Sequence, residues 1–425
     1  MGGAVRDSLM GRDPHDWDVA TNAPPTAVCK LFPHVVETGM KHGTVTVVCD
    51  SLNVEVTTFR LDGEYEDGRR PNSVSFGCTL FEDLSRRDFT MNAVAYDPID
   101  NVFEDPFGGM KDIENKLIKC VGNPYTRFRE DGLRLVRALR FMATLEFNVD
   151  LHTLWAISQM YMPLDNVSVE RVKDELFKVM TAPKPSRMFN ATCATNVLEK
   201  FIPEHKAMIN CTQNRWHAYD VWTHTMKCVN ACPPDPILRF AALFHDVAKP
   251  IVKGKHHAHG DATFYDHENV GADMADTILR RLKFSNTDRE KIVHLVREHF
   301  VRYDSSWSSA TIRRWVRRVG VDNVKDILTL ARADNAAKGP VPREFVLDNG
   351  SIDELEQRIA DLNVTEKMPV STKVLAIDGT DVMRELNIPQ GKRVGEVLRA
   401  LLELVTDDPE LNMRENLLKM CKDVS

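Results

Sequence analysis

The stretch Asp16-Trp17-Asp18-Val19-Ala20 decides how the first part of this chain folds. Its two carboxylates stand two residues apart, and residues i and i+2 of an extended strand point to the same face. Paired hard oxygen ligands suit Mg²⁺, which binds through few protein carboxylates and completes its shell with substrate phosphates. We therefore expect a strand that carries a metal site for phosphoryl transfer. An isolated Asp-x-Asp pair is more often a solvated polar position, so its neighbours must decide.

Two features on either side of this stretch favour the metal site. Upstream, Gly2-Gly3 precede a helix start and offer exposed backbone N–H groups to a triphosphate. Downstream, Glu55 stands inside the apolar run Val54–Phe59, where its charge is costly unless a cation compensates it. The alternative is an edge strand with Glu55 facing water. We take Glu55 as a candidate third carboxylate of the site.

Short β-branched runs separated by turn residues continue to about residue 96. They lie at Thr44–Val48, Val54–Phe59 and Asn92–Tyr96, and a candidate helix covers Pro25–Phe32. This alternation predicts a small α/β or α+β domain over residues 1–125. The polar, Gly-rich segment 61–76 is expected to form a loop over the site.

Beyond Pro124 the strand signals fade, and apolar residues recur at helical spacing. We expect helices at Val169–Met180, Ile237–Ala248, Val270–Leu282, Arg289–Phe300 and Val394–Val405, with connections at Thr181–Pro185, Pro233–Pro236 and Lys338–Arg343. The expected regions after the first domain are 126–204, 205–340 and 341–425. Most of the C-terminal two thirds is therefore predicted to be helical.

Composition sets further limits. A chain of 425 residues is too long for one hydrophobic core, so several packed units are expected. No apolar run reaches the roughly 18 residues that span a bilayer, and the first residues lack a secretory pattern, so we expect a cytoplasmic protein. Nine cysteines without a C-x-x-C pair suggest neither a disulfide framework nor a zinc ribbon. The net charge of −7 argues against indiscriminate nucleic-acid binding but permits a local basic surface.

Five motifs in order resemble those of the class II CCA-adding enzymes and bacterial poly(A) polymerases. They are GGAVRD at Gly2–Asp7, DWDVATNA at Asp16–Ala23, VEVTTFR at Val54–Arg60, RRDFTMNAVAYD at Arg86–Asp97 and EDGLRLVRALRF at Glu130–Phe141. The resemblance implies an α+β protein. Its polymerase-β-like nucleotidyltransferase head has a mixed sheet and is followed by a mainly α-helical neck, an HD-domain body and a helical tail.

The resemblance also implies roles in the head. Asp16 and Asp18 would bind two Mg²⁺ ions that activate the RNA 3′ hydroxyl and neutralise the triphosphate, with Glu55 as a third catalytic carboxylate. The implied nucleotide-binding residues are Gly2, Gly3 and Arg6 for the phosphates, Arg86, Arg87, Asp88 and Asn92 for the sugar and phosphates, and Arg137 in the last motif. Members of this family normally carry a helix and strand before the Gly-Gly turn. Here the sequence starts at Met1, so we expect an exposed sheet edge and a looser turn.

Asp131 and Arg134 are three residues apart in a segment with a strong helical pattern, so they are expected to be surface neighbours. Cytosine and adenine each show an amino donor beside an unprotonated ring nitrogen, which an Asp–Arg pair complements, whereas uracil and guanine do not. The resemblance implies the same role, an amino-acid template that selects CTP and ATP. The alternative is an ordinary surface ion pair worth a few tenths of a kcal/mol.

A second cluster follows the H…HD…D order of the HD phosphohydrolase superfamily. It comprises His224, His245, Asp246 and Asp334, with His267 and His299 as ligands of a second metal. Imidazole and carboxylate form a mixed site for a divalent transition metal, which can acidify water for attack on a phosphate ester. The alternative is a packing module. His256, His257 and His259 are expected to lie in an exposed loop.

Basic clusters in this acidic chain suggest where RNA would lie. The candidate RNA-binding residues are Arg140, Arg313, Arg314, Arg317 and Arg318. The leading interpretation is a CCA-adding enzyme that acts on tRNA with CTP and ATP. The alternatives are an A-adding enzyme or poly(A) polymerase, and an HD phosphohydrolase whose head binds RNA without transferase activity.

Overall fold

The structure is a computed structural model that describes residues 1–14, 16–49, 52–63, 74–160, 162–255, 261–340, 349–362 and 372–424. Most of the predicted loop at 61–76 and the histidine loop at 256–260 lie outside the described residues. The chain forms two compact units. Unit 1 comprises Met1–Lys206, Pro234–Pro236 and Ile278–Ser285, and unit 2 comprises Ala207–Pro233, Ile237–Thr277 and Asn286–Ser425.

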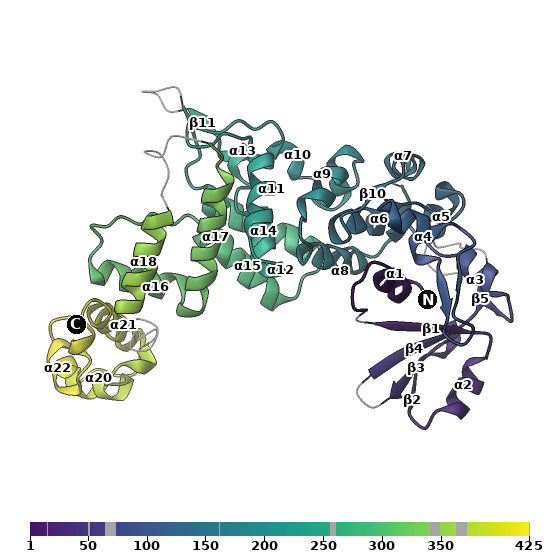
Figure 1. The fold of residues 1–425 in the computed structure, drawn as a ribbon. Helices are drawn as coiled ribbons and strands as arrows, with labels where there is room; N and C mark the ends of the chain where they lie inside the picture. Colours follow the sequence, from purple (N-terminus) through teal and green to yellow (C-terminus); the bar gives the residue numbers. More distant parts are fainter. Residues whose placement is uncertain are drawn as a thin grey trace. The chain divides into compact units, whose positions relative to one another are not determined.

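A four-stranded sheet forms the centre of the N-terminal head (Figure 1). Its strands are β1 Trp17–Thr21, β2 Val35–Gly39, β3 Thr44–Cys49 and β4 Leu52–Thr58, in the order β1-β4-β3-β2. Strand β1 runs parallel to β4, while β4 and β2 each run antiparallel to β3. The mixed sheet that the family resemblance implied is therefore confirmed.

The alternating side chains of this sheet explain why it has one covered and one open face. Val45, Val47 and Val56 are buried and pack with Val28 of α2 (Pro25–Leu31). Successive side chains of a strand point to opposite faces, so the residues between these valines face away from α2. That second face is polar and carries the carboxylates described below.

The rest of the head consists of short elements. They are α1 Gly3–Leu9, β5 Arg60–Asp62, β6 Val74–Phe76, α3 Leu80–Ser85, η2 Thr90–Asn92, β7 Ala95–Asp97, β8 Val102–Glu104, α4 Gly109–Glu114 and β9 Leu117–Ile118. The strand expected at Asn92–Tyr96 was wrong in its first half, because Asn92 ends a 3₁₀ turn and its side chain is held in a hydrogen-bond network. Pairing with β8 begins only at Ala95.

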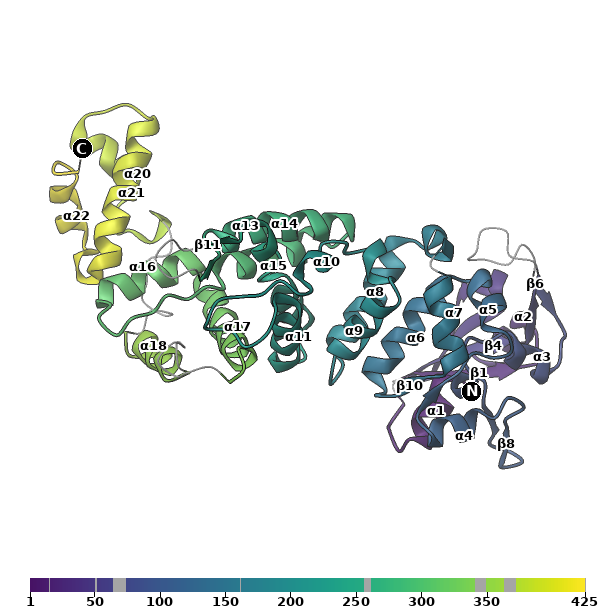
Figure 2. The ribbon, with the colours of Figure 1, turned by 90° about the horizontal axis from the view of Figure 1, so that it is seen from above.

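Helices complete unit 1. They are α5 Pro124–Glu130, α6 Leu133–Thr144, α7 Leu151–Gln159, α8 Val169–Met180 and α9 Ser186–Ala194. Helix α8 has the predicted bounds. Helix α6 packs against both α8 and α9, and the three lie side by side in Figure 2. Glu175 of α8 is 3% exposed and forms an ion pair with Arg140 of α6, so a buried charge pair joins these helices.

Unit 2 is almost entirely helical. Its main elements are α11 Val221–Ala231, α12 Pro236–Phe244, α13 Lys249–Val252, α14 His267–Arg281, α15 Asn286–Glu298, α16 Ser309–Val319, α17 Val324–Ala337 and α18 Asn349–Asp361, then α20 Gly379–Leu386, α21 Lys392–Asp407 and α22 Arg414–Met420. Helices α14 and α12 cross the boundary between the units by a few residues. In the described part of the chain no helix has both the length and the apolar character that a bilayer crossing requires.

Two expected helices are shorter than predicted, and each ends just before a histidine of the candidate metal cluster. Helix α12 stops at Phe244 rather than Ala248, and α15 stops at Glu298 rather than Phe300. In each case the residue after the helix is a histidine whose Nδ1 lies within hydrogen-bond distance of the carbonyl oxygen three residues earlier. The distance is 2.8 Å from His245 Nδ1 to Ala242 O and 2.7 Å from His299 Nδ1 to Val296 O. These side-chain bonds compete with continuation of the helix.

Candidate functional site

The open face of the head sheet brings the predicted carboxylates together. Asp18 in β1 pairs in register with Glu55 in the parallel strand β4, and residues paired in this way project from the same face. Asp16 lies in the bend before β1 and is exposed, as is Glu55. Strand β4 is central rather than at an edge, so Glu55 faces water from the middle of the sheet. Partial burial, together with the negative charge of Asp16, raises the pKa of Asp18.

This acidic face suits a cation that arrives with its substrate. A divalent cation would offset the burial and the repulsion from Asp16, which together raise the pKa of Asp18. Among the described residues, however, groups of three or more potential ligand atoms within 4.8 Å of one another are found in unit 2. The head carboxylates therefore suit Mg²⁺ whose remaining ligands come from water and phosphates.

The Gly-Gly turn is built into the head beside these carboxylates. Gly2 has a φ of 70°, donates its N–H to Val94 O at 3.1 Å, and is followed directly by α1. A Cβ at Gly2 would come within 2.7 Å of Arg87 Nη1, the end of a side chain that can shift, so the left-handed backbone is the main reason for glycine here. In the described part of the chain β1 has one partner strand, β4, as expected for an open sheet edge.

The structure gathers the other predicted nucleotide-binding residues around Asn92. Arg6 Nη1 donates to Asn92 Oδ1 at 2.8 Å, and Asn92 Nδ2 donates to Asp88 Oδ1 at 3.0 Å. Arg137 of α6 completes the network with a 2.8 Å bond from Nε to Asp88 Oδ2. Burial alone would raise the pKa of Asp88, but the Arg137 charge and the Asn92 hydrogen bond lower it to about 2.

The two neighbouring arginines are partly held by Asp83 of α3. Arg86 Nη2 lies 2.7 Å from Asp83 Oδ1, and Arg87 Nη2 lies 3.5 Å from Asp83 Oδ2. Arg87 also donates to Asn92 O at 3.3 Å, and burial lowers the pKa of its guanidinium. Both cations therefore belong to the network that adjoins the Gly2 turn.

The Asp131–Arg134 pair differs from its expected geometry. Asp131 has an extended backbone between α5 and α6, so the two residues do not share one helix surface. Its carboxylate accepts two hydrogen bonds from Arg171 of α8, at 2.7 and 3.1 Å, while Arg134 pairs with Glu130 at 2.6 Å. The break lies at Asp131 itself, since Gly132 already has helical backbone angles, and the Asp131 side chain accepts the Leu133 N–H at the start of α6.

The arginines predicted to bind RNA all have partners within the protein. Arg140 is engaged with the buried Glu175. The four arginines of α16 contact neighbouring acids and backbone carbonyls: Arg313 with Thr406 O and Asp407 O, Arg314 with Asp407, Arg317 with Thr406 and Glu403, and Arg318 with Glu298. Three of them thus dock α16 on the C-terminal end of α21, where unpaired carbonyls and the helix dipole attract cations.

In unit 2, five of the six predicted HD-motif residues are nearly fully buried. His224, His245, Asp246, His267 and His299 have 0–6% exposure, and the Asp334 side chain is 20% exposed. His224 Nε2 lies 2.8 Å from Asp334 Oδ1, and His245 Nε2 lies 3.1 Å from Asp246 Oδ2. His267 and His299 approach the other oxygen of Asp246 to 3.7 and 4.0 Å. The six residues, which are spread over residues 224–334 of the sequence, therefore form one compact cluster in the structure.

Hydrogen bonds orient three of these imidazoles toward Asp246. Nδ1 of His245, His267 and His299 lies 2.7–2.8 Å from a backbone carbonyl oxygen, which fixes the proton on Nδ1 and leaves Nε2 as a lone-pair donor. Asp246 Oδ2 lies beside Lys249 Nζ and His245 Nε2, whereas Oδ1 is buried without a hydrogen-bond partner among the described residues. Inward-facing imidazole nitrogens around a buried carboxylate fit a divalent transition metal.

The electrostatics of the cluster also call for positive charge. Burial alone would lower the pKa of His245, but Asp246 and Asp334 raise it to about 10. Neighbouring cations hold the pKa of both aspartates well below its usual value despite burial. A divalent cation would provide by coordination the positive charge that a protonated histidine otherwise supplies.

Two residues of this cluster were missed by the sequence reasoning. Lys249 is 5% exposed, and its Nζ lies 2.7 Å from Asp246 Oδ2. His217 stacks edge-on against His224 and groups with it and Asp334, and burial lowers its pKa to about 2. Lys249 could have been found as a lysine one helical turn after the His-Asp dipeptide. His217 had no such signal, because it lies before α11 begins.

Comparisons with known proteins agree with this architecture. The family model described as the poly A polymerase head domain matches residues 1–119, that of the RNA and SrmB-binding site of polymerase A matches 146–209, and that of tRNA nucleotidyltransferase domain 2 matches 261–421. Together they match more than half of the chain.

The similar curated proteins are bacterial. The CCA-adding enzyme of Geobacillus sp. (strain WCH70) is 47% identical over 197 residues, which are 46% of this chain and 48% of that protein. That of Geobacillus kaustophilus is 51% identical over 183 residues, covering 43% and 45%. The chain thus spans about half the length of the curated relatives it matches.

A solved structure extends the likeness along the chain. The Bacillus stearothermophilus CCA-adding enzyme in complex with CTP is 28% identical, with a TM-score of 0.72 over 99% of this chain and 91% of that one. The five head and neck motifs, the mixed sheet and these matches all point to one conclusion: the chain belongs to the tRNA nucleotidyltransferase and poly(A) polymerase family.

Proposed function

We propose that this protein is a CCA-adding enzyme, which transfers CMP, CMP and AMP from CTP and ATP to the 3′ end of a cytoplasmic tRNA. The observation that carries the proposal is the register of Asp18 beside Glu55 on an open sheet face, next to the Gly2 turn. An acidic face and a turn with a free backbone approach meet the two needs of nucleotidyl transfer, which are cations and phosphate donors. The similar curated proteins carry this activity in their names.

In the reaction, the RNA 3′ oxygen attacks the α-phosphorus of the nucleotide, a P–O bond forms, and pyrophosphate leaves. Mg²⁺ held by Asp16 and Asp18 would polarise the 3′ hydroxyl and neutralise the triphosphate. The Gly2-Gly3 turn would receive the phosphates with the Gly3 backbone N–H as a donor, while the Gly2 N–H holds the turn to Val94 O. The network from Arg6 through Asn92 to Asp88 is buried and fully paired, so it would hold the incoming nucleotide with little reorganisation.

Asp131 and Arg134 would choose the base. A carboxylate has about four lone-pair sites, so Asp131 can remain bound to Arg171 and still accept a hydrogen bond from a cytosine or adenine amino group. The bidentate bond to Arg171 would fix the direction of that acceptor. Arg134 would offer its donors to the neighbouring ring nitrogen.

The test uses purified protein, Mg²⁺ and tRNA lacking CCA, with each labelled nucleotide supplied separately and in combination. Addition of C followed by A supports a CCA-adding enzyme. Addition of A alone supports an A-adding enzyme or poly(A) polymerase instead. If no nucleotide is added while the phosphatase activity described next is present, the head serves only to bind RNA and the proposal fails.

A second activity is favoured by the inward-facing imidazoles of unit 2. We propose that His224, His245, Asp246 and Asp334 hold one divalent transition metal, and that Asp246, His267 and His299 hold a second. The metal would lower the pKa of bound water for attack on a phosphate ester at an RNA end. In a 2′,3′-cyclic phosphate, water adds to phosphorus, one P–O bond to the ribose breaks, and the freed oxygen takes a proton to give a monoester and a hydroxyl.

This second activity is tested with an oligoribonucleotide that ends in a 2′,3′-cyclic phosphate, in the presence of Mn²⁺, Ni²⁺ or Co²⁺. We expect hydrolysis by the wild-type protein and none by His245→Ala, whose bound metal is measured in the same preparation. Metal retained with no hydrolysis of cyclic, mono- or diester substrates would leave the cluster as a structural metal site and end this proposal.

A further inference from the structure

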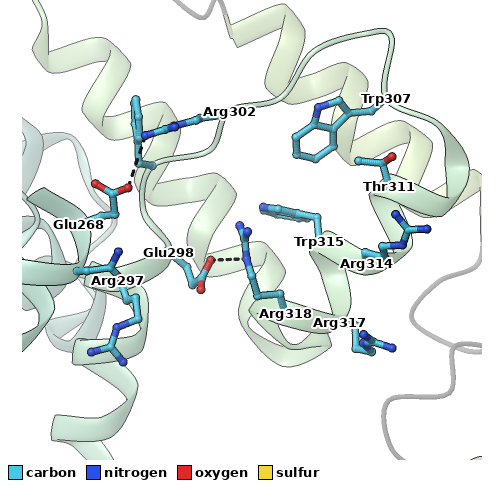
Figure 3. Close-up of a pocket in the computed structure, with 12 residues that line it drawn as sticks. Glu268, Arg297, Glu298, Arg302, Trp307, Thr311, Arg314, Trp315, Arg317 and Arg318 are labelled. Carbon is cyan, nitrogen blue, oxygen red and sulfur yellow. Dashed lines mark ion pairs between the residues drawn. The ribbon is translucent and has the colours of Figure 1, made fainter. Parts of the chain in front are cut away.

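A pocket in unit 2 borders the histidine–aspartate cluster but is not part of it. Its volume is about 730 Å³, and it lies between the ends of α14 and α15 and helix α16. Figure 3 shows Glu268 and Arg302 on one side of the pocket and the rings of Trp307 and Trp315 on the other. Its charged lining comprises five arginines, Arg297, Arg302, Arg314, Arg317 and Arg318, against two glutamates, Glu268 and Glu298.

Two pairs of consecutive residues place this pocket next to the cluster. Glu268 follows His267, and its Oε2 lies 3.2 Å from His267 Nδ1 and is buried without a hydrogen-bond partner among the described residues. Phe300 follows His299, and its ring centroid lies 5.5 Å from that of His267. A ligand in the pocket would therefore end beside the second set of proposed metal ligands.

Two of the arginines have little to neutralise them. Arg302 has a 65% exposed side chain, lies over the Phe300 ring at 4.6 Å, and reaches Glu268 only at 3.6 Å. Arg297 pairs at 3.0 Å with Asp273, whose side chain is 79% exposed, and such exposed pairs are worth little. By contrast, the pairs of Arg314, Arg317 and Arg318 described above commit those residues to structure. The pocket lining therefore has more arginines than glutamates, and Arg297 and Arg302 are the two whose charges are least neutralised.

The aromatic side of the pocket offers a surface for a flat ligand. Trp307 is half-buried and packs edge-on against Tyr303 at 5.4 Å, which holds its ring in place. Trp315 is 5% exposed and supports the pocket from α16. Exposed guanidinium groups beside a fixed indole combine the two elements of single-strand recognition, phosphate contact and base stacking.

From this arrangement we propose that the pocket binds the last nucleotides of a single-stranded RNA 3′ end, with phosphates at Arg297 and Arg302 and a base against Trp307. The inference deepens the proposed phosphohydrolase activity by giving its substrate a binding path, and it rests on that activity. An acidic peptide would pair with the arginines, but it would not explain the half-buried ring of Trp307 or the position of the pocket beside the proposed metal ligands.

The experiment separates binding from hydrolysis. A six-nucleotide RNA that carries a 2′,3′-cyclic phosphate and a photoreactive 4-thiouridine near its 3′ end is crosslinked to the full-length chain, and the crosslinked peptide is identified. We expect the crosslink in the segment that contains Trp307, whether or not the RNA is cleaved. A crosslink confined to other segments overturns the pocket proposal even if hydrolysis is observed.

Matched variants add a quantitative measure. Arg302→Glu and Trp307→Ala should each raise the KM for hydrolysis of this RNA by about tenfold, while Trp307→Phe should recover most of the loss. Hydrolysis of bis(p-nitrophenyl) phosphate, which is too small to span the pocket, should be unchanged. The control is Arg384→Glu, the same charge change at a 73% exposed side chain of α20. Equal effects of Arg384→Glu and Arg302→Glu would contradict the proposal.

Discussion

The two candidate sites of this protein hold their carboxylates in opposite surroundings. In the head, Asp16 and Glu55 are exposed on an open sheet face, whereas Asp246 in unit 2 is 1% exposed and ringed by imidazoles. An exposed site gains its full set of ligands only when phosphates arrive, so it can exchange metal with each substrate. A buried site whose ligands are oriented in advance should keep its metal between reactions. On the proposed functions, the difference would separate a metal that comes with the substrate from one that resides in the protein.

The largest expected effect comes from removing one head carboxylate. Asp18→Asn should lower the rate of nucleotide addition roughly a thousandfold, because several kcal/mol of charge stabilisation would be lost. The measurement is single-turnover addition of CMP to tRNA lacking CCA. Hydrolysis at the second site serves as the internal control and should not change. A similar loss in both activities would mean that the substitution disturbs the whole fold.

The second-largest effect should be a different response of the two sites to metal removal. Brief treatment with EDTA followed by gel filtration should abolish nucleotide addition until Mg²⁺ is restored, while metal analysis still finds a transition metal in unit 2. Asp246→Asn should release that metal and lower the melting temperature of unit 2, because a buried metal binds only the folded state. If EDTA strips both metals equally fast, the contrast drawn here is incorrect.

Base selection gives a smaller and more specific effect. Asp131→Arg should remove the preference for CTP and ATP over UTP, measured as relative rates of single addition, because it reverses the acceptor offered to the base. Arg171→Met is the matched control, since it removes the ion pair of Asp131 without removing its carboxylate. Because Arg171 also directs the Asp131 carboxylate, this control should lose only part of the preference, and an unchanged preference in Asp131→Arg would contradict the proposal.

The smallest effect concerns the buried hydrogen-bond network of Arg6, Asn92, Asp88 and Arg137. The folded-state pKa of Asp88, about 2, lies below its ordinary value of 3.8, so the unfolded chain binds more protons as the pH falls. The stability that this group contributes, about 2 kcal/mol, should be complete above pH 5 and lost as the pH falls from about 5 to 2. In urea unfolding, Asp88→Asn should therefore be less stable than wild type at pH 7, about half of that difference should remain near pH 3, and little of it should remain near pH 2. A constant difference across this range would assign the effect to Asn packing.

Most of the fold could be predicted because its signals are local. The β-branched runs of β3 and β4 and the apolar period of α8 appear in the sequence, and their bounds were predicted closely. Helix ends at functional residues were not, because the imidazoles of His245 and His299 take the carbonyls that would continue the helix. A competition of this kind depends on where the side chain points.

The sequence by itself determined which chemistry is present: three carboxylates, a glycine turn and an ordered set of histidines and aspartates, each close to a recognisable motif. Only the tertiary structure decided their partners. It set Glu55 beside Asp18 through parallel pairing, gave Asp131 to Arg171 rather than to Arg134, and used the arginines of α16 to hold α21. The reason is physical: spacing along a chain fixes the direction of a side chain, but the charge that neutralises it comes from elements distant in sequence.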